Sequence, residues 1–140
     1  MKTLSSGICL TQAHWEQMKA DVTSRIGEEA CGFVLGEGHT SRMVIPVENI
    51  YHDPFKFRMD PTQELHAFVQ AEERGWEILA IYHSHPHGIS EPSHSDIDEL
   101  TFPGTLYLIW YQVVDQWKCR AYLMQTQAVV NEVAITIVDG

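Results

Sequence analysis

Residues 76–88 read WEILAIYHSHPHG, and this stretch decides the fold. The part from Trp76 to Tyr82 is an apolar run of the length of a buried strand. His83 and His85 follow it directly. Because alternate side chains of a strand point to the same face, both imidazoles are delivered to one side of the strand's carboxyl end. The stretch therefore predicts a central strand with a polar site at its end.

Two helices are expected, one well before this strand and one just ahead of it. The first has Thr11 as its N-cap and ends near Ile26, with Gly27 just beyond. The second begins at Asp60-Pro61, since aspartate suits an N-cap and proline the first helical position, and it ends before Gly75. The side chains expected to face the core are Ala13, Trp15, Met18, Val22 and Ile26 in the first helix, and Leu65, Phe68 and Val69 in the second.

The remaining apolar and β-branched runs predict further strands. They lie at 31–36, 42–47, 106–113, 117–124 and near 133–138, with Asp115 in a turn between the third and fourth. Most neighbours are joined by short connections, which disfavours a doubly wound parallel sheet. We expect residues 1–140 to form a single domain of the α/β (α+β) class, with a mixed, mainly antiparallel sheet flanked by helices.

Charge and composition exclude several kinds of partner. The 140 residues include 19 acidic and 9 basic residues, for a formal charge of −10. Such a surface repels phosphate backbones, so nucleic acid is not an expected partner. No apolar run approaches the roughly 18 residues that span a bilayer, and the first residues lack a secretion signal, so no membrane partner and a cytoplasmic location are expected. The three cysteines are widely spaced and suggest reduced thiols.

Four of the eight histidines fall within residues 83–94, which suggests a metal site. A catalytic zinc ion takes three protein ligands of nitrogen and oxygen type and keeps one position open for water. His83, His85 and Asp96 would supply such a set, because the eleven positions between the last two allow a loop to fold back. A simpler reading makes Ser93 to Asp96 only a helix capping box at the start of a short helix over 95–100.

The loop histidines and the small residues of this region leave alternatives open. His87 and His94 are alternative ligands or outer partners of the site, or are simply solvated. Ser84 lies between the two predicted ligands and should point to the opposite face as a structural residue. Cys31 and Gly32 are interpreted as packing residues that let neighbouring strands approach closely.

A wider pattern resembles a known family. Glu29-Ala-Cys-Gly, then His83-Ser-His-Pro, nine further residues and Asp96 resemble the JAMM (MPN+) metalloprotease family, in its minimal prokaryotic type. The resemblance implies a cytidine-deaminase-like MPN fold and a bound Zn²⁺. It also implies His83, His85 and Asp96 as zinc ligands, Glu29 as general acid/base and Ser93 as a donor near the oxyanion. Glu28 is a rival for the base, although adjacent carboxylates of an extended segment face opposite sides.

The resemblance also implies a substrate. Members hydrolyse peptide or isopeptide bonds after the C-terminal Gly-Gly of ubiquitin-like proteins, and the small prokaryotic members are associated with β-grasp sulfur carriers. A non-catalytic MPN scaffold and a small-peptide amidohydrolase are the alternatives. Phe55, Phe57 and Met59 alternate in the loop over 49–59, which either binds the substrate tail or packs as a core face. A homodimer is possible through exposed sheet edges.

Overall fold

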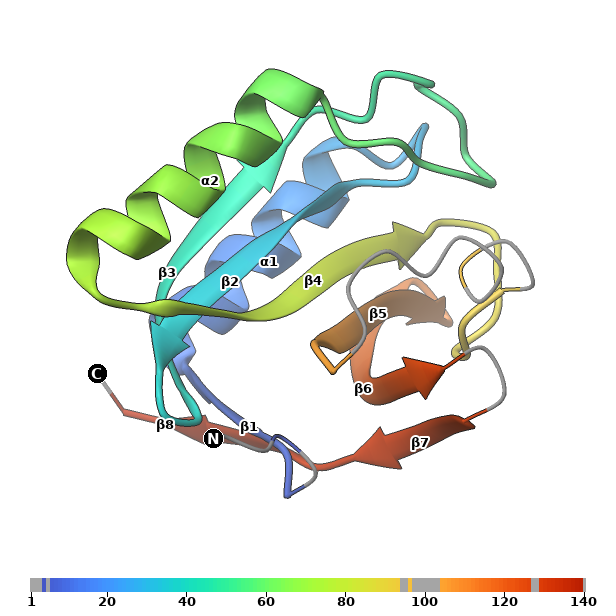
Figure 1. The fold of residues 1–140 in the computed structure, drawn as a ribbon. Coiled ribbons are helices and arrows are strands. Elements are labelled where there is room, and N and C mark those ends of the chain that lie inside the picture. The colour runs from blue at the N-terminus through green and yellow to red at the C-terminus, as the bar shows by residue number, and fades with distance from the viewer. Residues whose placement is uncertain (1–3, 5, 94–95, 97–103, 127–128, 140) are drawn as a thin grey trace.

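The computed structural model describes residue 4 and residues 6–93, 96, 104–126 and 129–139. These residues form eight strands and two helices (Figure 1). The elements are β1 (Ile8–Thr11), α1 (Gln12–Ser24), β2 (Cys31–Glu37), β3 (Thr40–Val47), α2 (Pro61–Arg74), β4 (Glu77–His85), β5 (Leu106–Val113), β6 (Gln116–Thr126), β7 (Val129–Val133) and β8 (Ile135–Val138). Neither helix is long and apolar enough to cross a membrane, among the residues described.

All eight strands belong to one sheet in the order β7-β6-β5-β4-β2-β3-β1-β8. The β2–β3, β2–β4, β5–β6 and β6–β7 pairs are antiparallel, whereas β1–β3, β1–β8 and β4–β5 are parallel. The predicted mixed, mainly antiparallel sheet is therefore confirmed. The histidine strand β4 lies between β2 and β5, so its backbone is hydrogen-bonded on both sides.

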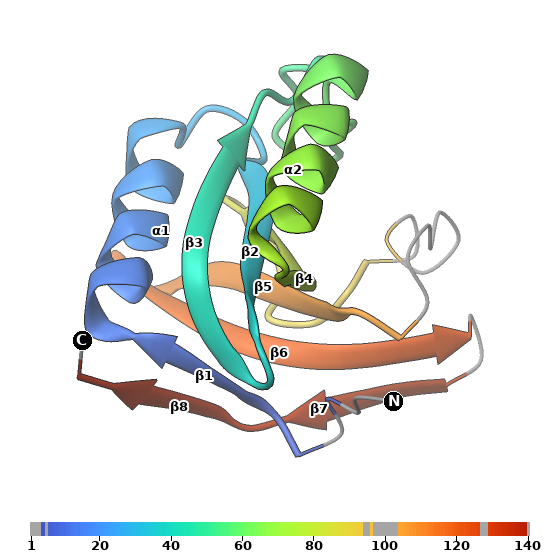
Figure 2. The same ribbon diagram turned by 60° about the vertical axis from the view of Figure 1, so that its left-hand side comes forward.

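The C-terminal end of the chain differs from the sequence prediction. The single last strand expected near 133–138 is two strands, which break at Ala134. Val133 pairs with Ala121 of β6, whereas Ile135 pairs with Ile8 of β1, at opposite ends of the strand order. The sheet is therefore strongly curled, and β7 and β8 run as one extended segment along its lower side (Figure 2). The short strand β1 was not predicted.

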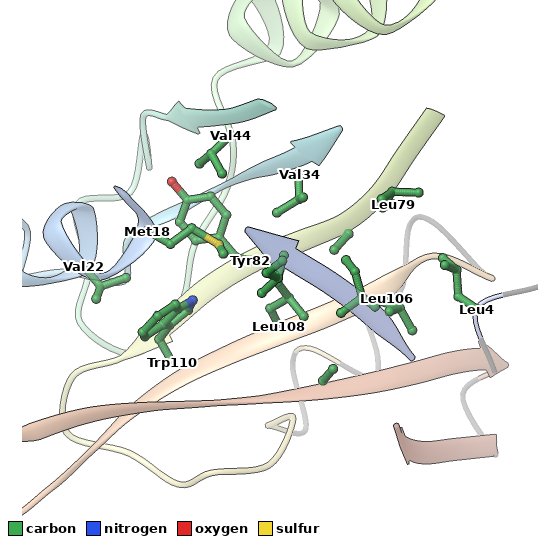
Figure 3. Packing of buried hydrophobic residues seen from close by; sticks show 14 of the residues in the cluster. Leu4, Met18, Val22, Val34, Val44, Leu79, Tyr82, Leu106, Leu108 and Trp110 are labelled. Carbon is green, nitrogen blue, oxygen red and sulfur yellow. The ribbon is translucent and has the colours of Figure 1, made fainter. Parts of the chain in front are cut away.

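Helix α1 covers one apolar cluster of the sheet. Its N-cap is Thr11, as predicted, because the Thr11 side chain accepts a hydrogen bond from the amide of His14. Met18 and Val22 are buried, and they pack with Tyr82, Leu108 and Trp110 (Figure 3). Ala13 and Ile26 are exposed, contrary to expectation. The remaining expected residue, Trp15, is partly buried against the cluster.

Helix α2 lies over a second apolar cluster and corrects the predicted core stripe. Leu65 is 62% exposed and Val69 is 41% exposed, and only Phe68 of the expected stripe packs against the core. The buried positions are Ala67 and Ala71, whose short side chains let the helix lie close to the sheet. The helix begins at Pro61 and is closed by Gly75 in the left-handed conformation, as expected, whereas Asp60 makes no side-chain capping hydrogen bond.

Candidate metal centre

The two strand histidines occupy the same face of β4. His83 lies opposite Cys31 of β2 and Ile109 of β5, so the sheet fixes its backbone from both sides. His83 is fully buried and His85 is 4% exposed. Phe57 stacks on the His83 ring with 4.7 Å between the ring centroids. The sequence prediction that the strand delivers both imidazoles to one side is therefore confirmed.

Asp96 meets the two histidines across the loop. Its Oδ2 lies 3.1 Å from Nε2 of His83 and 3.2 Å from Nε2 of His85, and the two Nε2 atoms are 3.1 Å apart. The amide of Ser93 donates to Asp96 Oδ2 at 2.7 Å, and the amide of Asp96 donates to Ser93 Oγ at 3.2 Å. The capping arrangement thus exists, and it holds the carboxylate against the imidazoles.

Glu29 completes the group from the segment just before β2. One atom from each of Glu29, His83, His85 and Asp96 lies within 4.8 Å of the others, and Glu29 is 2% exposed. Its main chain is held on both sides, because the Glu29 amide donates to the Asp53 carbonyl and the Asn49 side chain donates to the Glu29 carbonyl. The structure brings together these four side chains.

Glu28 and Ser84 behave differently from the cluster residues. Glu28 lies outside the group and contacts His52, with 3.1 Å between Oε1 and Nδ1. Ser84 points to the opposite side, where its Oγ accepts a hydrogen bond from the Ala30 amide at 2.8 Å. The Ser84 amide donates in return to the Ala30 carbonyl at 3.0 Å. Ser84 is structural, as predicted, and it fastens the residue next to Glu29.

The donor atoms fit a small divalent cation. With metal–ligand distances of about 2.0–2.2 Å, the ligand atoms of a tetrahedral zinc site are separated by roughly 3.3–3.5 Å. The three separations here, 3.1, 3.1 and 3.2 Å, are close to that value. His85 Nδ1 lies 2.8 Å from the Ile89 carbonyl, to which it can only donate, so a neutral His85 presents a lone pair at Nε2. A lone pair beside the carboxylate oxygen of Asp96 requires a proton or a cation between them.

Burial and neighbouring charges shift the pKa values of this group. Desolvation raises the pKa of Glu29 to about 8, Asp96 and Asp53 add to the rise, and His85 opposes it. The pKa of Asp96 is well below its usual range, because the attraction of both histidines and the Ser93 amide outweighs burial. Burial lowers the pKa of His83, whereas contacts with Asp96 and Ile89 outweigh burial and raise that of His85. Glu29 is thus the proton-holding carboxyl and Asp96 the ionised one.

Sequence reasoning missed the residues that hold the loop after β4. Tyr122 on β6 donates from its hydroxyl to the Ser90 carbonyl at 2.8 Å. Arg120, also on β6, donates to Ser90 Oγ at 3.2 Å. These contacts fix the residue next to Ile89, whose carbonyl orients His85. Nothing near Tyr122 or Arg120 in the sequence resembles a motif, so only the sheet order reveals them.

A small pocket opens beside the cluster. Its volume is about 130 Å³, and its lining is almost entirely apolar. The lining residues are Glu29, Pro54, Phe55, His85, Gly88, Ile89 and Ser93. Phe55 is 67% exposed at the mouth of the pocket, whereas Phe57 and Met59 pack into the core. The interpretation of the loop over 49–59 as a core face is therefore confirmed for Phe57 and Met59 and is wrong for Phe55. Phe55 and Ile89 form the apolar rim of the pocket.

The remaining loop predictions have mixed outcomes. The His87 ring lies 5.9 Å from the ring of Phe55 and is outside the four-residue group. His94 and most of the short helix expected over 95–100 lie outside the described residues. Asp96 is described, and it is helical. The three cysteines are all free.

Known proteins with related sequences support a family assignment. The chain is 28% identical over 125 residues to a desampylase of Pyrococcus furiosus, covering 89% of this chain and 86% of that protein. It is 36% identical over 85 residues to a probable TtuB-protein conjugate cleaving protease of Thermus thermophilus, covering 60% and 57%. A CysO-cysteine peptidase of Mycobacterium bovis is 29% identical over 108 residues, covering 75% and 74%.

Solved structures agree with the observed fold. A solution structure of a Desulfitobacterium hafniense protein has a TM-score of 0.84 and 30% identity, covering 95% of this chain and 94% of that one. A JAB1/MPN domain protein from Archaeoglobus fulgidus has a TM-score of 0.59 at 17% identity, covering 96% and 99%, and shows the fold alone. The family model of prokaryotic homologues of the JAB domain matches residues 11–126. The chain therefore belongs to the prokaryotic JAB/MPN (JAMM) domain family.

Proposed function

We propose that this protein is a JAMM-type zinc metallopeptidase that cleaves after the C-terminal Gly-Gly of a ubiquitin-like or β-grasp sulfur-carrier protein. The observation that carries the proposal is the convergence of Glu29, His83, His85 and Asp96 within 4.8 Å, beside a pocket that Glu29 and His85 help to line. A hydrolytic zinc site needs three protein ligands of nitrogen or oxygen type and a nearby base. Here two imidazoles and one carboxylate would be the ligands, and the second carboxylate would be the base.

The residues divide the chemistry between them. His83, His85 and Asp96 would hold the metal, and a zinc ion there would polarise the substrate carbonyl and favour ionisation of a nearby water. Glu29 accepts the proton of the attacking water and returns it to the leaving amine. Its burial suits this task, because a carboxyl with a raised pKa holds and releases a proton near neutral pH.

Ser93 is proposed to stabilise the oxyanion. It lines the pocket together with Glu29 and His85, so the residue lies beside the place where a substrate carbonyl would bind. A preorganised donor at such a place typically contributes about 3–4 kcal/mol to transition-state binding. The contact between Ser93 Oγ and the Asp96 amide keeps the side chain oriented toward this part of the loop.

The substrate class rests on the relatives and on the pocket. The relatives are named as a desampylase, a protease of TtuB-protein conjugates and a CysO-cysteine peptidase, and we infer that their partners belong to the ubiquitin-like or sulfur-carrier class. A pocket of about 130 Å³ between Phe55 and Ile89 accommodates a chain without side chains better than bulky residues, which suits a Gly-Gly tail. We further propose that the protein acts in the cytoplasm, where its three free thiols would stay reduced.

The direct test uses β-grasp carriers extended by a short peptide beyond Gly-Gly. We expect cleavage after the second glycine, detected by mass spectrometry, and its loss on adding a chelator and in Glu29→Gln. Glu28→Gln is the matched control and should remain active, because Glu28 contacts His52 outside the cluster. A protein that binds zinc but cuts no carrier would favour an interaction module. Equal cleavage of short peptide amides would favour a small-peptide hydrolase.

A further inference from the structure

A buried polar network lies behind the candidate site, on the side of helix α1. Arg25, which follows the last residue of α1, makes a two-point ion pair with Asp21, with contacts of 3.0 and 2.7 Å. The same guanidinium donates to the Val47 carbonyl at 2.7 Å and to the Cys31 carbonyl at 2.9 Å. One side chain therefore joins α1 to both β2 and β3.

The two carbonyls belong to a structurally important rung of the sheet. Cys31, the first residue of β2, is paired with Val47, the last residue of β3. On its other side, Cys31 is paired with His83. Glu29 lies two residues before Cys31, where the chain has left the β2–β3 ladder. Arg25 thus holds the strand at the point where it delivers the proposed base.

Tyr82 ties the same network to the histidine strand. Its ring is fully buried in the apolar cluster shown in Figure 3, and its hydroxyl donates to Asp21 Oδ2 at 2.6 Å. Gly32 makes this contact possible, because a Cβ at position 32 would overlap the Tyr82 ring. Asp21 therefore binds Arg25, which holds β2, and Tyr82, which precedes His83 on β4.

We propose that Arg25, held by Asp21 and Tyr82, is a positioning residue that keeps Glu29 in register with the histidines of β4. This inference rests on the proposed function for its catalytic consequence. The histidines depend on it less, since His83 is paired with both β2 and β5, and His85 with β5. Glu29 lies beyond the end of β2 and depends on local contacts, namely those of Arg25, the Ser84–Ala30 pair, Asn49 and Asp53.

The first test needs no activity and uses the metal-free protein. Arg25→Lys keeps the charge but loses the planar fork that bridges two carbonyls and a carboxylate. We expect amide hydrogen exchange at Ala30 to accelerate by about tenfold or more, with Leu108 in the centre of β5 little changed. Arg42→Lys is the matched control, because Arg42 pairs with Glu37 on the exposed surface, and it should leave both amides unchanged.

The second test uses the zinc-loaded enzyme and a carrier extended beyond Gly-Gly. Arg25→Lys should lower kcat roughly ten- to a hundredfold while KM and zinc affinity change less than about threefold. In a Glu29→Gln background it should cause no further loss, because its effect acts through Glu29. Tyr82→Phe, which removes only one hydroxyl, should give a smaller change of the same kind. It is the milder variant to use if Arg25→Lys does not fold.

The outcomes separate this inference from the proposed function. Equal acceleration of the Ala30 and Leu108 amides, or losses of kcat that add to those of Glu29→Gln, would mean that Arg25 only stabilises the fold, and the inference would be overturned. A wild-type protein that cuts no carrier, while Ala30 exchange still responds to Arg25→Lys, would refute the proposed function and leave the positioning of Glu29 supported.

Discussion

The two halves of the candidate site are built in different ways. His83 and His85 lie on β4, where β2 and β5 fix the backbone at His83, β5 fixes it at His85, and burial fixes both side chains. Asp96 and Ser93 come from the loop that follows β4. The described part of this loop is held by contacts of single residues, chiefly those of Ser90 with Tyr122 and Arg120.

This difference shows which part of the site is rigid and which part substitutions can weaken gradually. The strand half is set by the alternation of a single strand and changes only if a ligand is removed. The loop half depends on side chains from β6, so substitutions there should weaken the site in graded steps. This contrast leads to four predictions, in order of decreasing expected effect.

Removal of a strand ligand should have the largest effect. In His83→Ala, zinc affinity should fall by more than about a hundredfold, because even outer partners of metal ligands typically contribute ten- to a hundredfold. Peptidase activity should vanish with the metal, as measured by zinc titration and carrier cleavage. His87→Ala is the control, since His87 contacts Phe55 outside the cluster, and its zinc affinity should match the wild type. Wild-type zinc affinity in His83→Ala would exclude this residue as a ligand.

Removal of the proposed base should separate binding from catalysis. Glu29→Gln should lower kcat by roughly 10²–10⁴-fold while one zinc ion per chain remains bound, because general bases contribute about that factor. Steady-state kinetics on a carrier conjugate and metal analysis of the same sample provide the measurement. Full activity in this variant would remove Glu29 from the mechanism and point to another base.

The metal-free protein should lose stability as pH rises from about 4.5 to 8. Folding raises the pKa of Glu29 from 4.5 to about 8, so the folded state binds more protons than the unfolded state in that range. The stabilisation is therefore complete below the lower value and is lost through the upper one. The expected decrease is a few kcal/mol, since one pKa unit corresponds to about 1.4 kcal/mol.

Denaturant unfolding of wild type and Glu29→Gln at several pH values measures this linkage. The variant should show the flatter profile, because its amide does not titrate. His85, with its raised pKa, contributes a slope of the same sign, and His83, with its lowered pKa, contributes one of the opposite sign; both residues are present in the two proteins. Parallel profiles for the two proteins would show that Glu29 has an ordinary pKa in the folded state.

A change in the loop anchor should have the smallest effect. Tyr122→Phe removes the hydrogen bond to the Ser90 carbonyl and should weaken zinc binding by up to about tenfold, without abolishing it. The comparison is with Tyr51→Phe, a half-exposed residue of the loop over 49–59, and this variant should bind zinc as the wild type does. A loss as large as that of His83→Ala would mean that zinc binding depends on this loop contact as much as on a strand ligand.

Local signals in the sequence predicted much of the fold. Thr11, Pro61 and Gly75 mark helix ends through capping preferences that act over a few residues, and the structure confirms them. The prediction for α2 failed because apolarity was taken as the sign of burial. Ala67 and Ala71 are buried, since small residues let the helix approach the sheet, and Leu65 remains outside.

Long-range arrangement could not be predicted from the same signals. Ala134 separates two strands that pair with β6 and β1, and nothing in the run over 133–138 indicates such different partners. For the site, strand alternation predicted the placement of His83 and His85, and the family resemblance indicated Glu29. Tyr122, Arg120 and Arg25 act through contacts more than 20 residues away or through main-chain carbonyls, which leave no local pattern.

The most direct test of the account is a crystal structure of the protein with zinc, with anomalous scattering recorded at the zinc absorption edge. The account predicts one strong peak per chain, in contact with Nε2 of His83, Nε2 of His85 and Asp96 Oδ2, with the Glu29 carboxyl facing the remaining position. A saturated crystal with no peak among these atoms, or with the three groups turned away from one another, would contradict it.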